Sequence, residues 1–144
     1  VSVIRDDSRI ECIDAGLRTL IVPITSLEAV LGMNPDQAAL KQFCIKNDVD
    51  IILVFFFFFV SGQNMMSTRV FAPRFGYLED PATGSGNSAF GYYMLKNSLW
   101  DGSAISIEQN AERAAFNVVK LKEAARRVLF GGSATTRIEG SYIL

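Results

Sequence analysis

The 144-residue sequence contains no histidine and only two cysteines, Cys12 and Cys44. Without histidine, the usual zinc sites, the Ser-His-Asp triad and Cys-His nucleophiles are excluded within this chain. The two cysteines are too few for a disulfide framework and too far apart in sequence for a CxxC site. Acid–base chemistry must therefore rest on carboxylates, lysine, tyrosine or residues of another chain, and we expect no metal site.

The sequence also lacks an excess of charge of either sign. The formal net charge is -1, and Arg126 and Arg127 are the only adjacent basic residues. A protein that follows a nucleic-acid backbone needs a basic stripe. We therefore expect no nucleic-acid partner.

No apolar run is long enough to cross a membrane. The most apolar segment, residues 49–60, is interrupted by Asp50 and is far shorter than the roughly 20 residues that span a bilayer. The first residues turn acidic at Asp6 and Asp7, which is not typical of a signal peptide. We expect a single cytoplasmic domain over residues 1–144, without membrane contact.

Hydrophobic patterning predicts an α+β chain of strands and short helices. Strands are expected over residues 17–24, 49–60, 68–72 and 104–108, and helices over 25–31, from Pro35-Asp36 onward, and over 87–96. In the second helix Ala38, Ala39, Phe43 and Ile45 are expected to face inward, and Lys41 and Lys46 outward.

The C-terminal part of the chain gives two conflicting signals. Residues 113–129 are rich in helix-forming residues, yet Phe116/Val118 and Val128/Phe130 alternate as in strands, and Gly131-Gly132 is typical of a turn. We favour strands here, followed by another strand over residues 135–144 with a turn at Gly140-Ser141.

The segment EDPATGSG, residues 79–86, places a carboxylate before a helix start. Pro81 holds Asp80 extended, while Gly84 and Gly86 allow close backbone approach. The first N–H groups of the following helix, capped by Thr83, Ser85 or Asn87, lack intrahelical partners and attract anions. A substrate carboxylate would fit there, within reach of Asp80. The alternative is a capped loop with Asp80 in an Asx-type turn.

Other motifs do not fit this segment. Gly84, Gly86 and Gly91 have the wrong spacing for a GxGxxG fingerprint, and the segment lacks the lysine of a P-loop. Thr83 stands where a GxSxG elbow needs its first glycine. Nucleotide binding and serine hydrolysis are therefore not expected.

Several segments resemble the C-terminal half of the PhzF-like proteins of phenazine biosynthesis. In chain order they are RVFAP at 69–73, Gly76, EDPATGS at 79–85, Ala89 and GYYML at 91–95. Residues 16–22, 105–109 and the pairs Gly131-Gly132 and Glu139-Gly140 agree more loosely with the start of the second domain, an I-x-I-x-Q strand and a final hairpin.

This resemblance implies a fold and a site. The fold would be half of a diaminopimelate-epimerase-like pair, a curled, mostly antiparallel sheet around one central helix. Asp80 would be the catalytic aspartate, and Thr83, Gly84, Ser85 and Gly86 would bind the substrate carboxylate. The implied reaction is proton abstraction and return at carbon, without a metal or organic cofactor.

The chain departs from the family pattern in ways that bear on function. The family's glutamate acid/base and a nearby histidine belong to its first domain. Many relatives follow the strand's glutamine with a glycine-rich turn, whereas Gln109 is followed by NAERA at 110–114. We therefore expect an isomerase half that needs a homodimer partner or a complementary N-terminal-half polypeptide; the alternative is a non-catalytic carboxylate-binding or scaffold protein.

Three other features have open interpretations. The five phenylalanines at 55–59 indicate either a strand buried on both faces or, as we favour, one face inside and one against a partner. Arg69 is expected to form a salt bridge within the sheet rather than bind a substrate anion. Glu79 is expected to be an exposed or hydrogen-bonded neighbour of Asp80, with proton sharing between them as the alternative.

Overall fold

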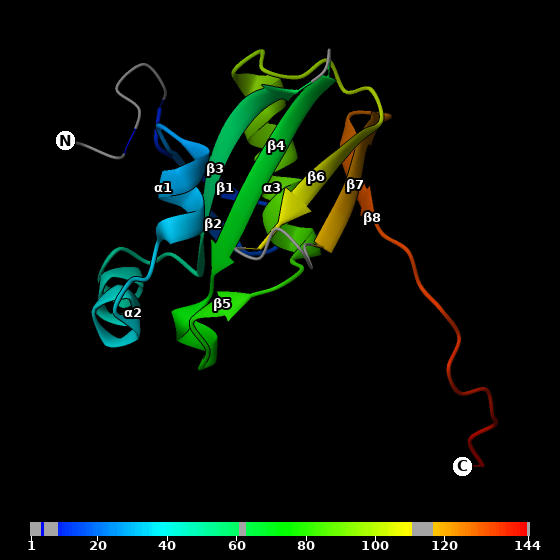
Figure 1. The fold of residues 1–144 in the computed structure, drawn as a ribbon. Coiled ribbons are helices and arrows are strands. Elements are labelled where there is room, and N and C mark those ends of the chain that lie inside the picture. The colour runs from blue at the N-terminus through cyan, green and yellow to red at the C-terminus, as the bar shows by residue number, and fades with distance from the viewer. Residues whose placement is uncertain (1–3, 5–8, 61–62, 111–116, 144) are drawn as a thin grey trace.

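The computed structural model describes residue 4 and residues 9–60, 63–110 and 117–143. Its strands form a mixed sheet that curls around a helix, with two further helices outside (Figure 1). The elements are β1 (Glu11–Asp14), β2 (Arg18–Pro23), α1 (Leu27–Gly32), α2 (Gln37–Lys46), β3 (Ile51–Val60), β4 (Gln63–Phe71), the 3-10 turn η1 (Pro73–Phe75), β5 (Glu79–Asp80), α3 (Gly84–Lys96), β6 (Ile105–Gln109), β7 (Asn117–Ala124) and β8 (Arg127–Gly131). No helix in the described ranges has the length and apolar character of a membrane span.

The sheet has the strand order β1-β2-β3-β4-β6-β7-β8, and β5 pairs with β4. The β2/β3 and β4/β6 pairs are parallel, and the remaining pairs are antiparallel. The expected α+β class with a curled, mostly antiparallel sheet is confirmed. The choice of strands over a helix for the region 113–129 is also confirmed, since β7 and β8 occupy its described part.

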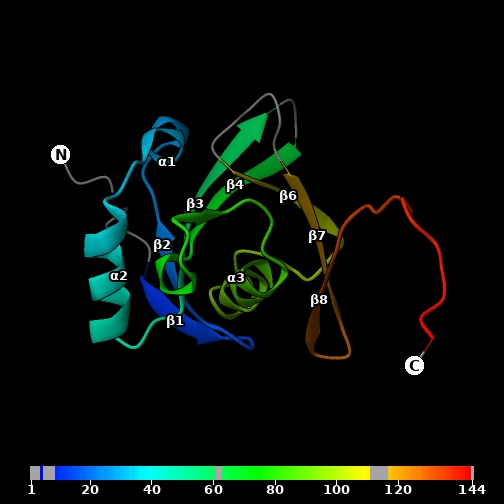
Figure 2. The ribbon, with the colours of Figure 1, turned by 90° about the horizontal axis from the view of Figure 1, so that it is seen from below.

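Helix α3 lies inside the curve of the sheet, where Figure 2 shows it end-on between β2/β3 and β7/β8. It begins at Gly84, three residues before the expected start at Asn87. Its apolar side chains Ala89, Phe90, Tyr93 and Met94 are fully buried, as predicted. They pack with apolar residues of the surrounding strands, including Ile21, Leu53, Val70, Ile107, Leu121 and Val128. Each large side chain buried in this way contributes about 1.5–3 kcal/mol.

Two glycines of α3 let β8 come close to the helix. Gly84 and Gly91 are seven residues apart, so they lie on the same stripe of the helix. A Cβ on Gly91 would lie 2.6 Å from Val128 Cγ1, and one on Gly84 would lie 2.3 Å from Phe130 Cε2. Because strand residues two apart share a face, Val128 and Phe130 both pack on this stripe.

The carboxyl end of α3 is fixed to β1. The side chains of Lys96 and Asn97 both hydrogen-bond the Glu11 carboxylate. The hydrogen bond from Lys96, followed by that from Asn97, lowers the pKa of Glu11 below its usual value. This contact therefore stabilises the fold above the unfolded-state pKa and is lost as the pH falls through the lowered value.

The opposite face of the sheet carries a second apolar core beneath α1 and α2. It contains Val22, Val30, Cys44, Ile52, Val54 and Phe71. The expected inward face of α2 is wrong: Ala38 and Ala39 are exposed, and Phe43 and Ile45 are 44% and 51% exposed. Helix α2 covers only the margin of the sheet. It packs there through one narrow row of side chains that includes Leu40 and Cys44, so its other apolar side chains remain exposed.

The phenylalanine run is shared between the two cores. Phe55 is buried against α3, with its ring centroid 4.6 Å from that of Phe90, and Phe57 packs on the same side. Phe56 packs against the second core, with residues of this same chain. This alternation follows from the strand period of two. The side chains at 58 and 59 lie outside the described residues.

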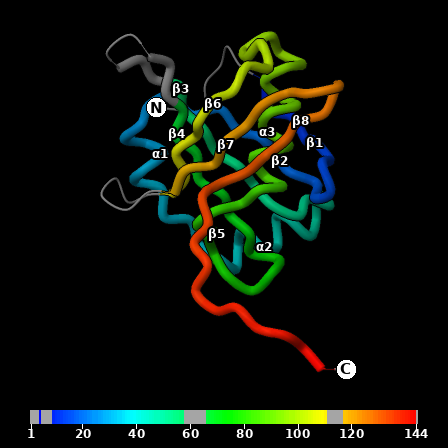
Figure 3. Tube along the Cα trace, turned by 90° about the vertical axis from the view of Figure 1, so that its right-hand side faces the viewer, coloured from blue at the N-terminus to red at the C-terminus, as the bar shows by residue number. Residues whose placement is uncertain are grey.

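The expected strand over 135–144, and with it a final hairpin at Gly131-Gly132 and Glu139-Gly140, is wrong in its described part. Residues 132–143 form no helix or strand and extend away from the sheet (Figure 3). Ile138, Tyr142 and Ile143 are 92%, 99% and 97% exposed. Strand-forming residues need a neighbouring strand to pack against, and none of the described strands pairs with this segment.

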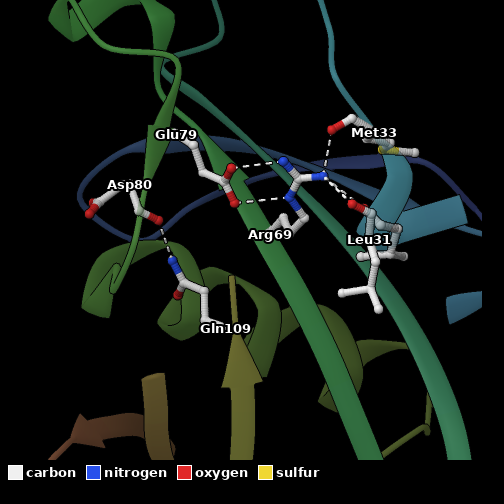
Figure 4. Close-up of polar contacts among 7 residues, drawn as sticks. Leu31, Met33, Arg69, Glu79, Asp80 and Gln109 are labelled. Atoms are coloured by element: carbon white, nitrogen blue, oxygen red, sulfur yellow. Dashed lines mark hydrogen bonds and ion pairs between the residues drawn. The ribbon is translucent and has the colours of Figure 1, made fainter. Parts of the chain in front are cut away.

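Arg69 ties the outer helix α1 to β5, and thereby holds the start of the candidate site. Its Nη1 donates to the carbonyls of Val30 and Met33 at 2.9 and 2.6 Å, at the carboxyl end of α1. Its Nε and Nη2 donate to the two oxygens of Glu79 at 2.9 and 2.8 Å (Figure 4). The expected salt bridge is therefore present, and it is a bidentate one. The Arg69 side chain is only 6% exposed, so these acceptors replace its hydration.

We predict that Gly91→Ala destabilises the protein by about 1–3 kcal/mol, because its methyl group would overlap Val128. Urea unfolding at fixed protein concentration measures this. Gly32→Ala is the matched control, since a Cβ there meets nothing within 4 Å. In a double-mutant cycle, Val128→Ala should recover part of the loss. Additive costs in the cycle would show that the two side chains do not compete.

We predict that Glu79→Gln costs roughly 2–3 kcal/mol, since it leaves a buried guanidinium without its counter-charge. Asp48→Asn is the control: it removes a carboxylate of 71% exposure from its pair with Arg18, and should cost less than about 1 kcal/mol. Equal losses in the two variants, measured by urea unfolding, would contradict the structural role given to the Arg69–Glu79 pair.

Candidate functional site

Strand β5 places two neighbouring carboxylates on opposite faces of the sheet. Glu79 pairs with Phe71 of the second core, and Asp80 pairs with Val70 of the core around α3. Paired residues of adjacent strands share a face. Glu79 is therefore turned toward Arg69, while Asp80 lies on the side of α3. The alternative of proton sharing between the two is not supported, because both Glu79 oxygens accept from Arg69.

Gln109, at the end of β6, holds the loop between Asp80 and α3. Its Nε2 donates to the Asp80 backbone oxygen at 2.7 Å (Figure 4) and to Thr83 Oγ1 at 3.2 Å. Its Oε1 accepts from the Thr83 N–H at 3.1 Å and from Asn87 Nδ2 at 2.6 Å. The side chain is fully buried; its bonds to Thr83 and Asn87 are buried, and its bond to the Asp80 carbonyl is part-buried.

Thr83 is the N-cap of α3, but its side chain makes no capping bond. Its N–H and its hydroxyl oxygen are both engaged by Gln109. The next residues, Gly84 and Ser85, are half-buried, and Gly86 is buried. An α-helix gives its first N–H groups no internal acceptor, and they carry about half a positive charge between them. The N–H groups of Gly84, Ser85 and Gly86 are therefore the candidate anion donors of this site.

Asn87 closes the buried side of the helix start. Its Nδ2 donates back to the Thr83 carbonyl at 2.9 Å as well as to Gln109. Its Oδ1 is a buried acceptor for which the described residues supply no partner. The polar groups beneath the first turn are thus fixed by this chain, except for that one oxygen.

The Asp80 carboxylate is half-buried at the mouth of this arrangement. Its Oδ1 accepts the Ala82 N–H at 3.3 Å, so the Asx-type turn is present. Asn117 of β7 holds the same loop from the other side by donating to the Pro81 carbonyl at 2.8 Å. The loop is therefore fixed by β4, β6 and β7 at once.

Phe130 lies over the first residue of α3. Its ring fills the space that a side chain at position 84 would need, yet 56% of the residue remains exposed. The ring gives the helix start an apolar neighbour on one side and leaves a surface for a ligand to contact. A Cβ at position 84 would require this ring to move.

The other chemically active candidates lie apart from this site. Burial raises the pKa of the Cys44 thiol, which opposes a role as a nucleophile. A pocket of about 670 Å³, lined by apolar residues such as Val22, Leu40, Phe43 and Phe71, lies on the opposite face of the sheet from Asp80. In the described part of the chain, no group of three or more Cys, Asp or Glu side chains could hold a metal ion.

The structure brings the sequence-predicted residues Asp80, Thr83, Gly84, Ser85 and Gly86 together at one helix start. The sequence indicated Asn87 only as a possible cap at the helix start, and it gave no site role to Gln109 or Phe130. The position of Gln109 at the end of an alternating strand was a signal, but only the fold shows which loop it reaches. The altered turn after Gln109 lies mostly outside the described residues, which resume at 117.

Comparison with known proteins places this geometry in a family. The family model of the phenazine biosynthesis-like proteins, PhzC-PhzF, matches residues 4–140. The chain is 31% identical over 137 residues, 89% of its length, to Antisense-enhancing sequence 1 of Schizosaccharomyces pombe, of which it covers 44%. It is 26% identical over 141 residues, 94% of its length, to the trans-2,3-dihydro-3-hydroxyanthranilate isomerase of Pseudomonas fluorescens, covering 48% of that protein.

A solved structure supports the fold. The PhzF family protein of Enterococcus faecalis superposes with a TM-score of 0.60 at 23% identity, over 86% of this chain and 44% of that one. The chain thus spans somewhat less than half the length of the relatives it matches. With a family model matching from residue 4 to residue 140 and a shared fold, the chain belongs to the phenazine biosynthesis-like, PhzF-type protein family.

Proposed function

We propose that this chain carries one side of an isomerase active site, in which Asp80 transfers a proton at a carbon atom of a small carboxylate. The observation that carries the proposal is the joint placement of a half-buried carboxylate and the free N–H groups of Gly84–Gly86 on one fixed loop. The isomerase name of the Pseudomonas fluorescens relative supports this reaction class.

The electrostatics of the site favour proton transfer over simple anion storage. The positive end of α3 attracts a substrate carboxylate, whereas an ionised Asp80 repels it. Protonation of Asp80 removes this repulsion, so substrate binding and protonation favour each other. In this proposal Asp80 donates a proton to, or takes one from, the substrate carbon, with no cofactor needed.

The partner acid/base comes from outside this chain. The chain has no histidine, and Glu79 is held by Arg69. We propose that residues 1–144 form the C-terminal domain of a diaminopimelate-epimerase-like pair, with α3 as its central helix. The other half would be a homodimer partner or a complementary N-terminal-half polypeptide.

A carboxylate-binding or scaffold protein without turnover is the second candidate. It is favoured by the lack of a second acid or base beside Asp80 among the described residues of the helix start. In that case the anion site would remain, but no carbon-bound hydrogen would exchange. Binding alone therefore does not separate the two functions.

We predict that Asp80→Asn separates binding from turnover. The wild-type protein should bind acetate at the first turn of α3, with amide NMR shifts at Gly84, Ser85 and Gly86. Removal of the like charge in Asp80→Asn should keep the affinity or raise it up to about tenfold. Asp101→Asn is the control, since Asp101 follows the far end of α3 and should change nothing.

The same variants test turnover. With trans-2,3-dihydro-3-hydroxyanthranilate in deuterated water, the wild-type assembly should incorporate deuterium at carbon, and Asp80→Asn should not. If acetate shifted only the amide signals of other residues, the proposed anion site would be contradicted. Binding without any wild-type exchange would favour the scaffold function, and undiminished exchange in Asp80→Asn would show that Asp80 is not the acid/base.

The proposed assembly is supported by apolar surface that this chain leaves uncovered. Ile138, Tyr142 and Ile143 are almost fully exposed on the extended segment 132–143. The family match includes this segment up to residue 140, so most of it belongs to the shared pattern. Exposed apolar residues of this kind mark interaction surfaces.

We predict that the chain is not a stable monomer at low micromolar concentration. The interface should be large and apolar, roughly 2,000 Å² or more in total, because obligate partners bury that much. Sedimentation equilibrium measures the mass, and deletion of residues 133–144 should weaken the association. A well-behaved particle of one chain's mass, with no dissociation curve, would show the prediction to be wrong.

A further inference from the structure

Among the described residues, the buried amide of Gln109 hydrogen-bonds the site loop and the start of α3 at three residues. Its bonds reach the backbone of Asp80, the backbone and hydroxyl of Thr83, and the side chain of Asn87. Asp80 precedes the first turn of α3, Thr83 is the N-cap of the helix, and Asn87 follows that turn. Gln109 itself belongs to a different element, β6, at the point where β6 pairs with Thr68 of β4.

The orientation of this amide is fixed by its partners. The Asp80 carbonyl can only accept, so it requires the Nε2 side. The Thr83 N–H and Asn87 Nδ2 can only donate, so they require the Oε1 side. A primary amide provides two N–H donors at one end and an oxygen with two lone pairs at the other. Neither a carboxylate nor an apolar side chain of similar size offers this combination.

We propose that Gln109 is the positioning residue of the site: it fixes the Asp80 loop against the first turn of α3 and so sets the affinity for the carboxylate. The inference rests on the proposed function, since it concerns the same anion-binding turn. Gln109 acts through Thr83 and Asp80 and does not touch the ligand. By accepting the Thr83 N–H, it also leaves only the three following amides to the ligand.

A purely structural role would give a different result from a positioning role. Loss of any buried hydrogen bond in the sheet reduces stability, but only loss of the bonds to the loop should change carboxylate affinity. Thr68 provides the matched control: it is fully buried, is paired with Gln109, and its Oγ1 donates to the Glu108 carbonyl at 3.2 Å. Thr68→Val removes this bond without touching the loop.

The test compares wild type, Gln109→Glu and Thr68→Val in acetate titrations followed by the amide shifts of Gly84–Gly86. At about pH 8 we expect Gln109→Glu to bind acetate about tenfold more weakly, since an ionised carboxylate faces the Asp80 carbonyl and loses both donors. At about pH 5.5 protonation restores one donor, and the affinity should recover toward that of the wild type at the same pH. Thr68→Val should match the wild type throughout.

Asp80 is the titratable residue on the loop that Gln109 holds, so the Asp80→Asn/Gln109→Glu double variant is titrated in parallel; the pH-dependent recovery must persist in it. Wild-type binding with Gln109→Glu unchanged would overturn the inference and leave the proposed function intact. Equal weakening in Thr68→Val would also overturn it. If the wild type did not bind acetate, both the proposed function and this inference would be contradicted.

If Gln109→Glu does not fold, Gln109→Asn replaces it. The shorter amide keeps both chemical ends but cannot reach both sides of the loop. Weaker acetate binding by a folded Gln109→Asn protein, with shifts at Thr83 and Asp80 already displaced before titration, supports the inference. Wild-type affinity in that variant overturns it.

Discussion

Helix α3 contacts both arms of the curled sheet, and its glycine stripe lets β8 approach closely enough to complete the curve. The apolar side chains of the helix supply much of the inner core. The same burial fixes the position and direction of the first turn of α3 relative to the sheet. Because Gly84 begins the helix against Phe130, and Gly91 contacts Val128, the packing that forms the core also determines where the amides of Gly84–Gly86 point.

Charge is separated across the sheet in a way that suits the site. The Glu79 carboxylate is turned to the outer face. There Arg69 donates hydrogen bonds both to this carboxylate and to the carbonyls at the end of α1. Asp80, the next residue, lies on the inner face beside the positive end of α3. One strand of two residues thus combines a structural ion pair with the carboxylate that we propose as the acid/base. The buried amide of Gln109 holds the loop that carries Asp80 without neutralising the Asp80 carboxylate.

Much of this arrangement was predictable from sequence. The EDPATGS segment indicated the helix start and Asp80, a continuous apolar run indicated β3, and alternation indicated β6 and the strands after residue 116. The exposed Phe43 was misjudged because apolar spacing does not show which stripe meets the sheet. The segment 132–143 was misjudged because strand propensity depends on a neighbour that the described chain does not provide. The role of Gln109 depends on contacts 22 to 29 residues apart, which no local pattern contains.

We propose that the first turn of α3 is a preformed carboxylate site. A crystal structure of the chain, in whatever assembly it forms, grown with acetate and compared with an acetate-free crystal tests this most directly. We expect the acetate oxygens within hydrogen-bonding distance of the Gly84–Gly86 amides, with the Gln109 contacts unchanged between the two crystals. An acetate bound elsewhere, or a helix start that rearranges to receive it, would contradict the account.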